Sequence, residues 1–168
     1  NLAVSTLRQA VELAETMLER FEDQERGGLW ASTDESLLAR MKDDYDGAEP
    51  SGNATAALAL AELGRLTDDR RWIDASRRIL NWIGERMRRL PQAVPHALLA
   101  LQRINESPAR LVLAGPWPGR ELEVLRAAAA TVYRPDVLIT RADGSHPSEF
   151  VRSLAVPAKT AMAFFCEG

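Results

Sequence analysis

The segment 45–53, which reads YDGAEPSGN, carries the side chains of this chain best suited to chemistry. Asp46 and Glu49 lie three residues apart in a stretch rich in turn-forming residues, so both carboxylates can face one cavity. Two carboxyl groups serve as general acid and general base in sugar chemistry when their surroundings separate their pKa values. We therefore predict Asp46 and Glu49 as catalytic residues. The structural alternative is that both satisfy backbone groups of the loop.

Five further residues are predicted to bind a ligand beside that pair. They are Tyr45, Ser51, Asn53, His96 and Trp30. Amide and hydroxyl groups can hydrogen-bond a hydroxyl-rich ligand, aromatic faces stack on sugar rings, and a histidine can act near neutral pH. Ser51 or Asn53 can instead cap the helix that follows. Trp30 can equally fill a helical core, and His96 can lie on the surface.

Alternating types of helix are expected to position these residues. Apolar side chains recur at three- and four-residue steps over 4–21 and 72–87, which gives each helix one buried face. Segment 54–63 is apolar nearly all round, as in a helix with neighbours on every side, and 97–104 is predicted as a second, more buried helix. A double ring of helical hairpins requires this alternation. We therefore predict part of such a ring over residues 1–105, with the acidic turn over its hollow.

The composition changes at Pro108, where short apolar runs begin to alternate with an alanine-rich helix. The segments 111–114 and 137–140 read as buried strands, and 121–131 between them reads as a helix. Strand, helix and strand over about 30 residues form a βαβ unit with parallel strands. Residues 161–165 can add a third strand. The prediction is a small α/β unit over residues 106–168.

Composition excludes several classes of function. The chain has 168 residues, with 21 basic and 24 acidic side chains and a net charge of −3, which is too small and scattered to attract nucleic acid or an anionic membrane. No apolar run approaches the roughly 20 residues that span a bilayer. His96, His146 and Cys166 form no metal-binding motif, and His146 is expected to be exposed in a turn. We predict no metal and no cofactor, and a single cysteine favours a cytoplasmic location.

Four segments together resemble one known family: the 45–53 motif, ATAAL at 54–58, LVLAG at 111–115 and AFFC at 163–166. The chain is similar to the C-terminal region of the thioredoxin-domain-containing spermatogenesis-associated protein 20 (YyaL-like) family. The resemblance implies a longer protein with an N-terminal thioredoxin-like domain and a toroid similar to six-hairpin glycosidases and N-acylglucosamine epimerases. The expected fold is mainly α, with α/α hairpins of a partial six-hairpin toroid followed by a small α/β unit (βαβ plus one strand).

Two features at the ends of the chain bear on that resemblance. The first five residues, NLAVS, contain no initiator Met and no targeting pattern, which predicts a chain cut from something larger. Family members continue past the position of Cys166 to a second cysteine, whereas this chain stops at Gly168. A redox or metal role for Cys166 is therefore not predicted.

Two functions follow from these predictions. The first is a C-terminal fragment of a protein of poorly defined activity, with a glycosidase- or epimerase-like domain that binds or processes carbohydrate. Its expected partners are a carbohydrate ligand and the absent thioredoxin-like domain and hairpins, and the fragment is expected to be inactive alone. The alternative is a non-catalytic helical scaffold for protein interaction. In either case we expect an exposed apolar flank that supports self-association.

Overall fold

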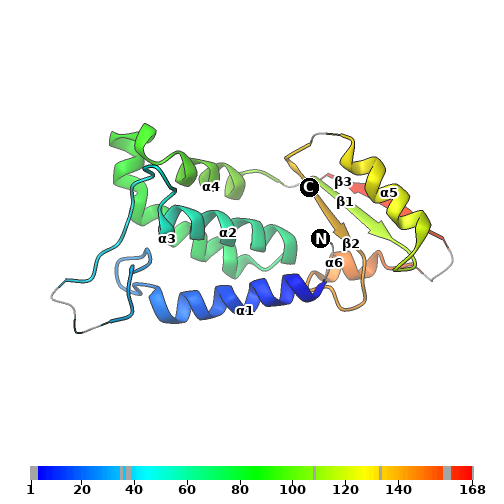
Figure 1. The fold of residues 1–168 in the computed structure, drawn as a ribbon, viewed down its shortest axis with the longest axis horizontal. Helices are drawn as coiled ribbons and strands as arrows, with labels where there is room; N and C mark the ends of the chain where they lie inside the picture. Colours follow the sequence, from blue (N-terminus) through cyan, green and yellow to red (C-terminus); the bar gives the residue numbers. More distant parts are fainter. Residues whose placement is uncertain are drawn as a thin grey trace. The chain divides into compact units, whose positions relative to one another are not determined.

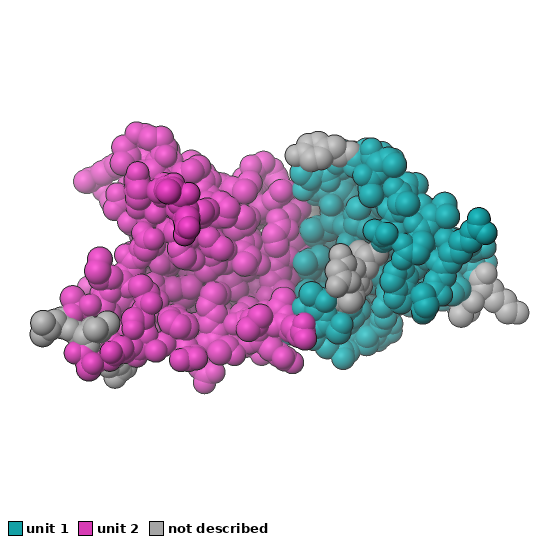
Figure 2. Space-filling view, viewed as in Figure 1, with its two compact units in different colours: residues 1–8, 66–68, 107–168 teal, residues 9–65, 69–106 magenta. Residues whose placement is uncertain are grey.

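The computed structural model describes residues 4–34, 36, 39–107, 109–132, 134–156 and 160–167. The chain divides into two compact units (Figure 2). The helical unit comprises residues 9–65 and 69–106, and the α/β unit comprises residues 107–168 together with 1–8 and 66–68. The prediction of a mainly α chain with a small α/β unit is confirmed. The toroid itself stays a prediction.

The most buried helix of the helical unit is the second. The elements of this part of the chain are α1 (Val4–Phe21), α2 (Gly52–Thr67), α3 (Arg70–Arg89), the 3-10 turn η1 (Pro91–Ala93) and α4 (Pro95–Asn105) (Figure 1). In α2 the small side chains let α3 approach closely. The Ser76 hydroxyl on α3 donates to the Ala57 carbonyl at 2.7 Å. A Cβ on Gly64 would lie 2.7 Å from the Ile73 side chain, so glycine is required there.

Helix α3 is amphipathic as predicted. Its Trp72, Ile79 and Ile83 are at most 2% exposed, because they form the stripe that packs into the unit. The N-cap is Asp69, whose carboxylate accepts the Arg71 N–H at 3.0 Å.

Helix α4 differs from its prediction. The apolar pattern predicted a more buried helix, whereas Ala97 and Ala100 are the residues of α4 that are buried. Leu99 is 37% exposed, and Leu98 and Leu101 are half-buried. The reason is the number of neighbours: the described packing of α4 is chiefly against α3 and η1.

The α/β unit contains a three-stranded sheet in the order β2-β1-β3. Its elements are β1 (Ala109–Ala114), α5 (Arg120–Ala130), β2 (Val137–Arg141), α6 (Glu149–Ser153) and β3 (Met162–Cys166). Strand β1 pairs in parallel with β2, which places Leu111 opposite Ile139. It pairs antiparallel with β3, which places Leu111 opposite Phe165. The predicted βαβ unit and third strand are both confirmed, and helix α6 is an addition that the sequence pattern did not predict.

Candidate functional site

Two glycines bring the loop after α1 against α3. Gly27 and Gly28 have φ of 73° and 76°, in the left-handed region that favours glycine. A Cβ on Gly28 would lie 2.7 Å from the indole of Trp82, and one on Gly27 would lie 2.7 Å from the carbonyl oxygen of Arg78. The backbone can therefore approach α3 this closely only with glycine at both positions.

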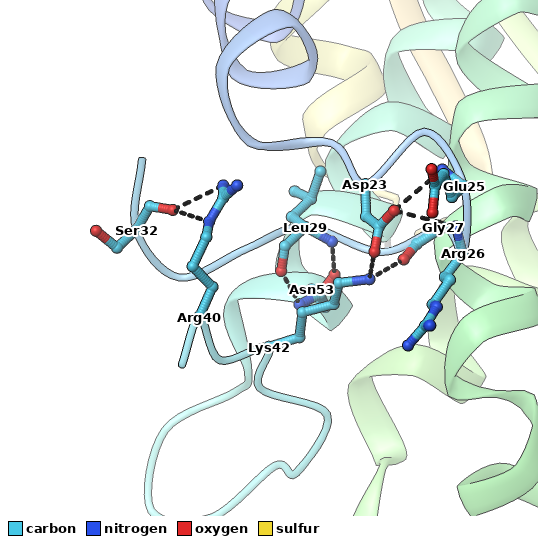
Figure 3. Close-up of polar contacts among 9 residues, drawn as sticks. All are labelled: Asp23, Glu25, Arg26, Gly27, Leu29, Ser32, Arg40, Lys42 and Asn53. Carbon is cyan, nitrogen blue, oxygen red and sulfur yellow. Dashed lines mark hydrogen bonds and ion pairs between the residues drawn. The ribbon is translucent and has the colours of Figure 1, made fainter. Parts of the chain in front are cut away.

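A buried ion pair holds the same loop together (Figure 3). The Lys42 ammonium lies 2.6 Å from Asp23 Oδ2, and the two side chains are 6% and 9% exposed. Lys42 also donates to the Gly27 carbonyl. Its nitrogen lies 4.3 Å from the ring centroid of Trp30 and 5.3 Å from that of Trp82. The hydrogen bond from Lys42 lowers the pKa of Asp23 to about 2.

Asn53 joins two separate parts of the loop to the start of α2. Its Oδ1 accepts the Leu29 N–H at 2.6 Å, and its Nδ2 donates to the carbonyls of Leu29 at 2.9 Å and Asp43 at 3.0 Å (Figure 3 draws the bonds to Leu29). The cap of α2 is the other sequence candidate, Ser51, whose hydroxyl accepts the Ala54 N–H at 3.1 Å. Asn53 is 3% exposed, so it acts here as a backbone clamp.

Asp46 ties together the starts of α2 and α4. One carboxylate oxygen accepts the Ser51 N–H and the other accepts the His96 N–H, both at 2.8 Å. Its own N–H donates to the Ala93 carbonyl at 2.9 Å. Glu49 is exposed, and its backbone carbonyl accepts the Gly47 N–H at 3.1 Å. No described contact joins the carboxylates of Asp46 and Glu49, and the catalytic pair stays a prediction.

A cleft of about 400 Å³ opens beside the start of α2. It is lined by Phe21, Leu29, Trp30, Ala31, Asp43, Gly52 and Asn53. The cleft thus brings together two of the predicted ligand-binding residues, Trp30 and Asn53. Asp46 and Glu49 are not among its lining residues, and Tyr45 is 54% exposed.

Asp43 was not singled out by the sequence analysis, although it lines this cleft. Its Oδ1 accepts the Tyr45 N–H at 3.1 Å, and the side chain is exposed. Its position in the acidic part of the loop was the available signal. The Asp23–Lys42 pair was also missed, because 19 residues separate its members and no local pattern connects them.

Comparison with known proteins gives the relationship of this chain. No family model matches it, and no solved structure matches it. Spermatogenesis-associated protein 20 from Homo sapiens is 34% identical over 148 residues, which is 86% of this chain. The proteins of the same name from Rattus norvegicus and Mus musculus are 34% and 33% identical over 150 residues, 88% of this chain. The chain matches a C-terminal region of spermatogenesis-associated protein 20.

The predicted family resemblance is therefore confirmed. The chain spans 19% of the length of its human, rat and mouse spermatogenesis-associated protein 20 relatives. The activity, substrates and partners of the whole protein are accordingly a matter for proposals.

The α/β unit contains a second buried polar group. His146 is 2% exposed, and the expectation that it lies in solvent is wrong. Its Nδ1 accepts the Ser148 N–H at 3.1 Å, which leaves the ring proton on Nε2, 3.1 Å from the Thr140 hydroxyl. With the ring turned inward, its Nδ1 accepts the backbone N–H of Ser148, the N-cap residue of α6. Burial lowers the pKa of His146.

Asp68 completes this group. Its carboxylate accepts hydrogen bonds from the Ser148 hydroxyl and from the Arg110 guanidinium. Burial alone would raise the pKa of Asp68, but the hydrogen bonds from Arg110 and Ser148 outweigh it and hold the pKa below its usual value. Ser148 also caps α6 by accepting the Val151 N–H at 3.1 Å. The cluster joins the sheet to α6 and presents no nucleophile to solvent.

Within the described part of the chain, no group of three or more His, Cys, Asp or Glu side chains is placed to hold a metal ion. None of the described helices has the length and apolar character needed to cross a bilayer. Cys166 is a free, half-buried thiol at the end of β3.

Proposed function

We propose that the helical unit contributes part of a binding cleft for a neutral, hydroxyl-rich ligand of carbohydrate type within a longer protein. The observation that supports this proposal is the cleft of about 400 Å³ beside α2. Its volume is in the usual range of small-molecule sites. Its lining combines the aromatic rings of Trp30 and Phe21 with the exposed carboxylate of Asp43, a combination suited to the apolar faces and hydroxyl groups of a sugar.

Each residue has a defined part in this proposal. Trp30 and Phe21 offer apolar ring surface, and Asp43 accepts hydrogen bonds from ligand hydroxyls. Asn53 positions the cleft wall, because its amide is already bonded to the backbone of residues 29 and 43. Asp46 likewise positions the starts of α2 and α4. Glu49, exposed on the adjoining turn, remains the candidate for acid–base chemistry with residues from elsewhere in the longer protein.

The test is a titration of the chain with neutral mono- and disaccharides, followed by the NMR signals of the tryptophan indole N–H groups. We expect saturable shifts at the Trp30 signal. Asp43→Asn should weaken binding about tenfold, since it replaces a charged hydrogen-bond acceptor, which corresponds to roughly 1.4 kcal/mol. Trp117→Leu, at a 44% exposed tryptophan outside the helical unit, is the matched control and should change nothing. Equal affinity in Asp43→Asn, or no response to any saccharide, would refute the proposal.

A different observation favours the second candidate, a non-catalytic helical scaffold. The side chains of Asp46, Ser51 and Asn53 are bonded to the chain's own backbone. On this alternative the 45–53 motif serves only to fix the helices. Asp46→Asn separates the two functions. The scaffold is supported if Asp46→Asn lowers the melting temperature and neither the variant nor the unmodified chain binds a saccharide. Saccharide binding by the unmodified chain supports the cleft.

A further inference from the structure

A second concave surface, the α3–α4 groove, lies in the helical unit and shares no residue with the cleft. Its volume is about 400 Å³. The aliphatic side chains that line it are Leu80 and Met87 from α3 and Leu98, Leu101 and Ile104 from α4. Leu80 is buried, whereas Met87, Leu98, Leu101 and Ile104 each keep part of their surface exposed. An apolar surface of this kind on a folded unit commonly binds another protein segment.

Gly84 gives the groove its depth. It lies inside α3, where glycine destabilises a helix relative to alanine. Packing within the described chain does not require it, because a Cβ there would meet only the tip of the Arg88 side chain, at 3.9 Å. Gly64 in α2 is the contrast, since Ile73 fills the space beside it. The open space over Gly84 admits the close approach of a further backbone.

Two arginines line the same groove. Arg77 and Arg88 are 11 residues apart on α3, about 16 Å along the helix axis. Their described ion pairs are with Asp74 and Glu85 of the same helix, and their side chains are 42% and 74% exposed. Such exposed ion pairs contribute little to stability, so a carboxylate from a partner can replace the present one.

Two other arginines of α3 form ion pairs with segments that are distant in sequence. Arg78 bonds Glu22, and Arg86 bonds Asp44, both at 2.7 Å and both across the fold to other segments. The described carboxylate partners of Arg77 and Arg88 lie instead on α3 itself. The charge of the groove side therefore complements an acidic partner.

We infer that the α3–α4 groove binds an amphipathic α-helix that has aliphatic side chains on one face and carboxylates about three turns apart. A helix fits because the groove runs between two packed helices, and a third helix can lay its ridge of side chains between them. The aliphatic floor receives the apolar face, Gly84 allows close approach, and Arg77 and Arg88 receive the two carboxylates.

The test measures peptide binding to the full chain by fluorescence anisotropy. The probe is a synthetic helix of about 18 residues with leucine on one face and two glutamates 11 positions apart. One control peptide has lysine in place of both glutamates, and a second has the same composition without an apolar face. We expect the acidic peptide to bind at least tenfold more tightly than either control, and more weakly as salt is added.

Two variants assign the binding to the groove. Gly84→Leu fills the groove without loss of stability, because leucine is the better helix former, and it should weaken binding at least tenfold. Exchanging both Arg77 and Arg88 for glutamate should reverse the preference from the acidic to the lysine peptide. Val124→Leu, at a 59% exposed site on α5, is the matched control and should bind as the unmodified chain does.

Three results would overturn the inference. They are no binding by the acidic peptide at millimolar concentration, unchanged binding in Gly84→Leu, and equal affinity for the acidic and lysine peptides. Sedimentation is measured alongside. A concentration-dependent dimer that Gly84→Leu abolishes would assign the groove to a second copy of the chain instead. None of these outcomes bears on the saccharide cleft, whose residues are separate.

Discussion

The helical unit and the α/β unit each contain a buried polar network, and the two are built from different chemistry. In the helical unit, Asp23, Lys42 and Asn53 hold the backbone of the loop between α1 and α2. In the α/β unit, His146 and Ser148 hold a turn against β2 and α6. The first network relies on the Asp23 carboxylate, whose pKa is lowered to about 2. The second relies on an imidazole nitrogen that accepts a hydrogen bond only while it is unprotonated.

This difference sets separate pH ranges for the two networks. The pKa of Asp23 is lowered from 3.8 to about 2, so its contribution to stability is complete above pH 3.8 and is lost as the pH falls toward 2. The pKa of His146 is lowered from 6.5, so the unfolded chain binds a proton first and stability is lost as the pH falls below 6.5. Mild acid should therefore weaken the α/β unit before the helical unit.

The largest effect should come from breaking the buried ion pair. Lys42→Met leaves the Asp23 carboxylate buried without its partner, and we expect a loss of about 3–5 kcal/mol in the free energy of unfolding. Urea unfolding followed by tryptophan fluorescence measures it. Arg126→Gln, which removes an exposed pair with Glu123, is the control and should cost less than about 0.5 kcal/mol. Equal costs for the two substitutions would contradict the comparison.

A slightly smaller loss is expected at Asn53. Asn53→Ala removes three hydrogen bonds and leaves buried groups of Leu29 unpaired, which should cost about 2–3 kcal/mol. The same urea experiment applies. Asn105→Ala is the matched control, because Asn105 is exposed and its described side-chain hydrogen bond is to the Leu101 carbonyl of its own helix. If Asn53→Ala unfolds at the same urea concentration as the control, the clamp assigned to Asn53 is wrong.

In the α/β unit, Ser148→Ala should cost about 1 kcal/mol, the usual value of a lost helix cap. The substitution also removes the hydroxyl donor to Asp68. Hydrogen exchange of the α6 and β1 amides measures the local effect. Ser153→Ala, at an exposed serine at the end of α6, is the control and should leave exchange unchanged. Faster exchange confined to the helical unit would be the contrary result.

The mildest effect should be the acid response of the α/β unit. Between pH 7 and pH 5, the amides of β1 and β2 should exchange faster, after correction for intrinsic rates, as His146 gains a proton and can no longer accept from Ser148. His146→Gln should remove this response, and His96→Gln should retain it. An equal acid response in both units would break the proposed separation.

Several elements of this chain follow from short-range patterns in its sequence. Apolar spacing predicted the buried face of α3, and the run of short apolar segments predicted the βαβ unit. Ser51 was one of two predicted caps for α2 and is the one used. Gly27 and Gly28 mark a turn with positive φ. These features depend on residues within a few positions of one another, so one sequence contains most of the information that specifies them.

Tertiary structure alone decided the roles of the polar side chains and the burial of α4. Asp46 bonds His96, 50 residues away, and Asn53 bonds Leu29, 24 residues away. His146 bonds Thr140 and Ser148, six and two residues away, and Ser148 in turn bonds Asp68, 80 residues away. An amide, carboxylate or imidazole bonds whichever group the fold places within hydrogen-bonding distance. The apolar side chains of a helix are buried only where another element packs against them. Residue type and local spacing therefore determined the elements, while the partners of Asp46 and Asn53 depended on chain segments distant in sequence.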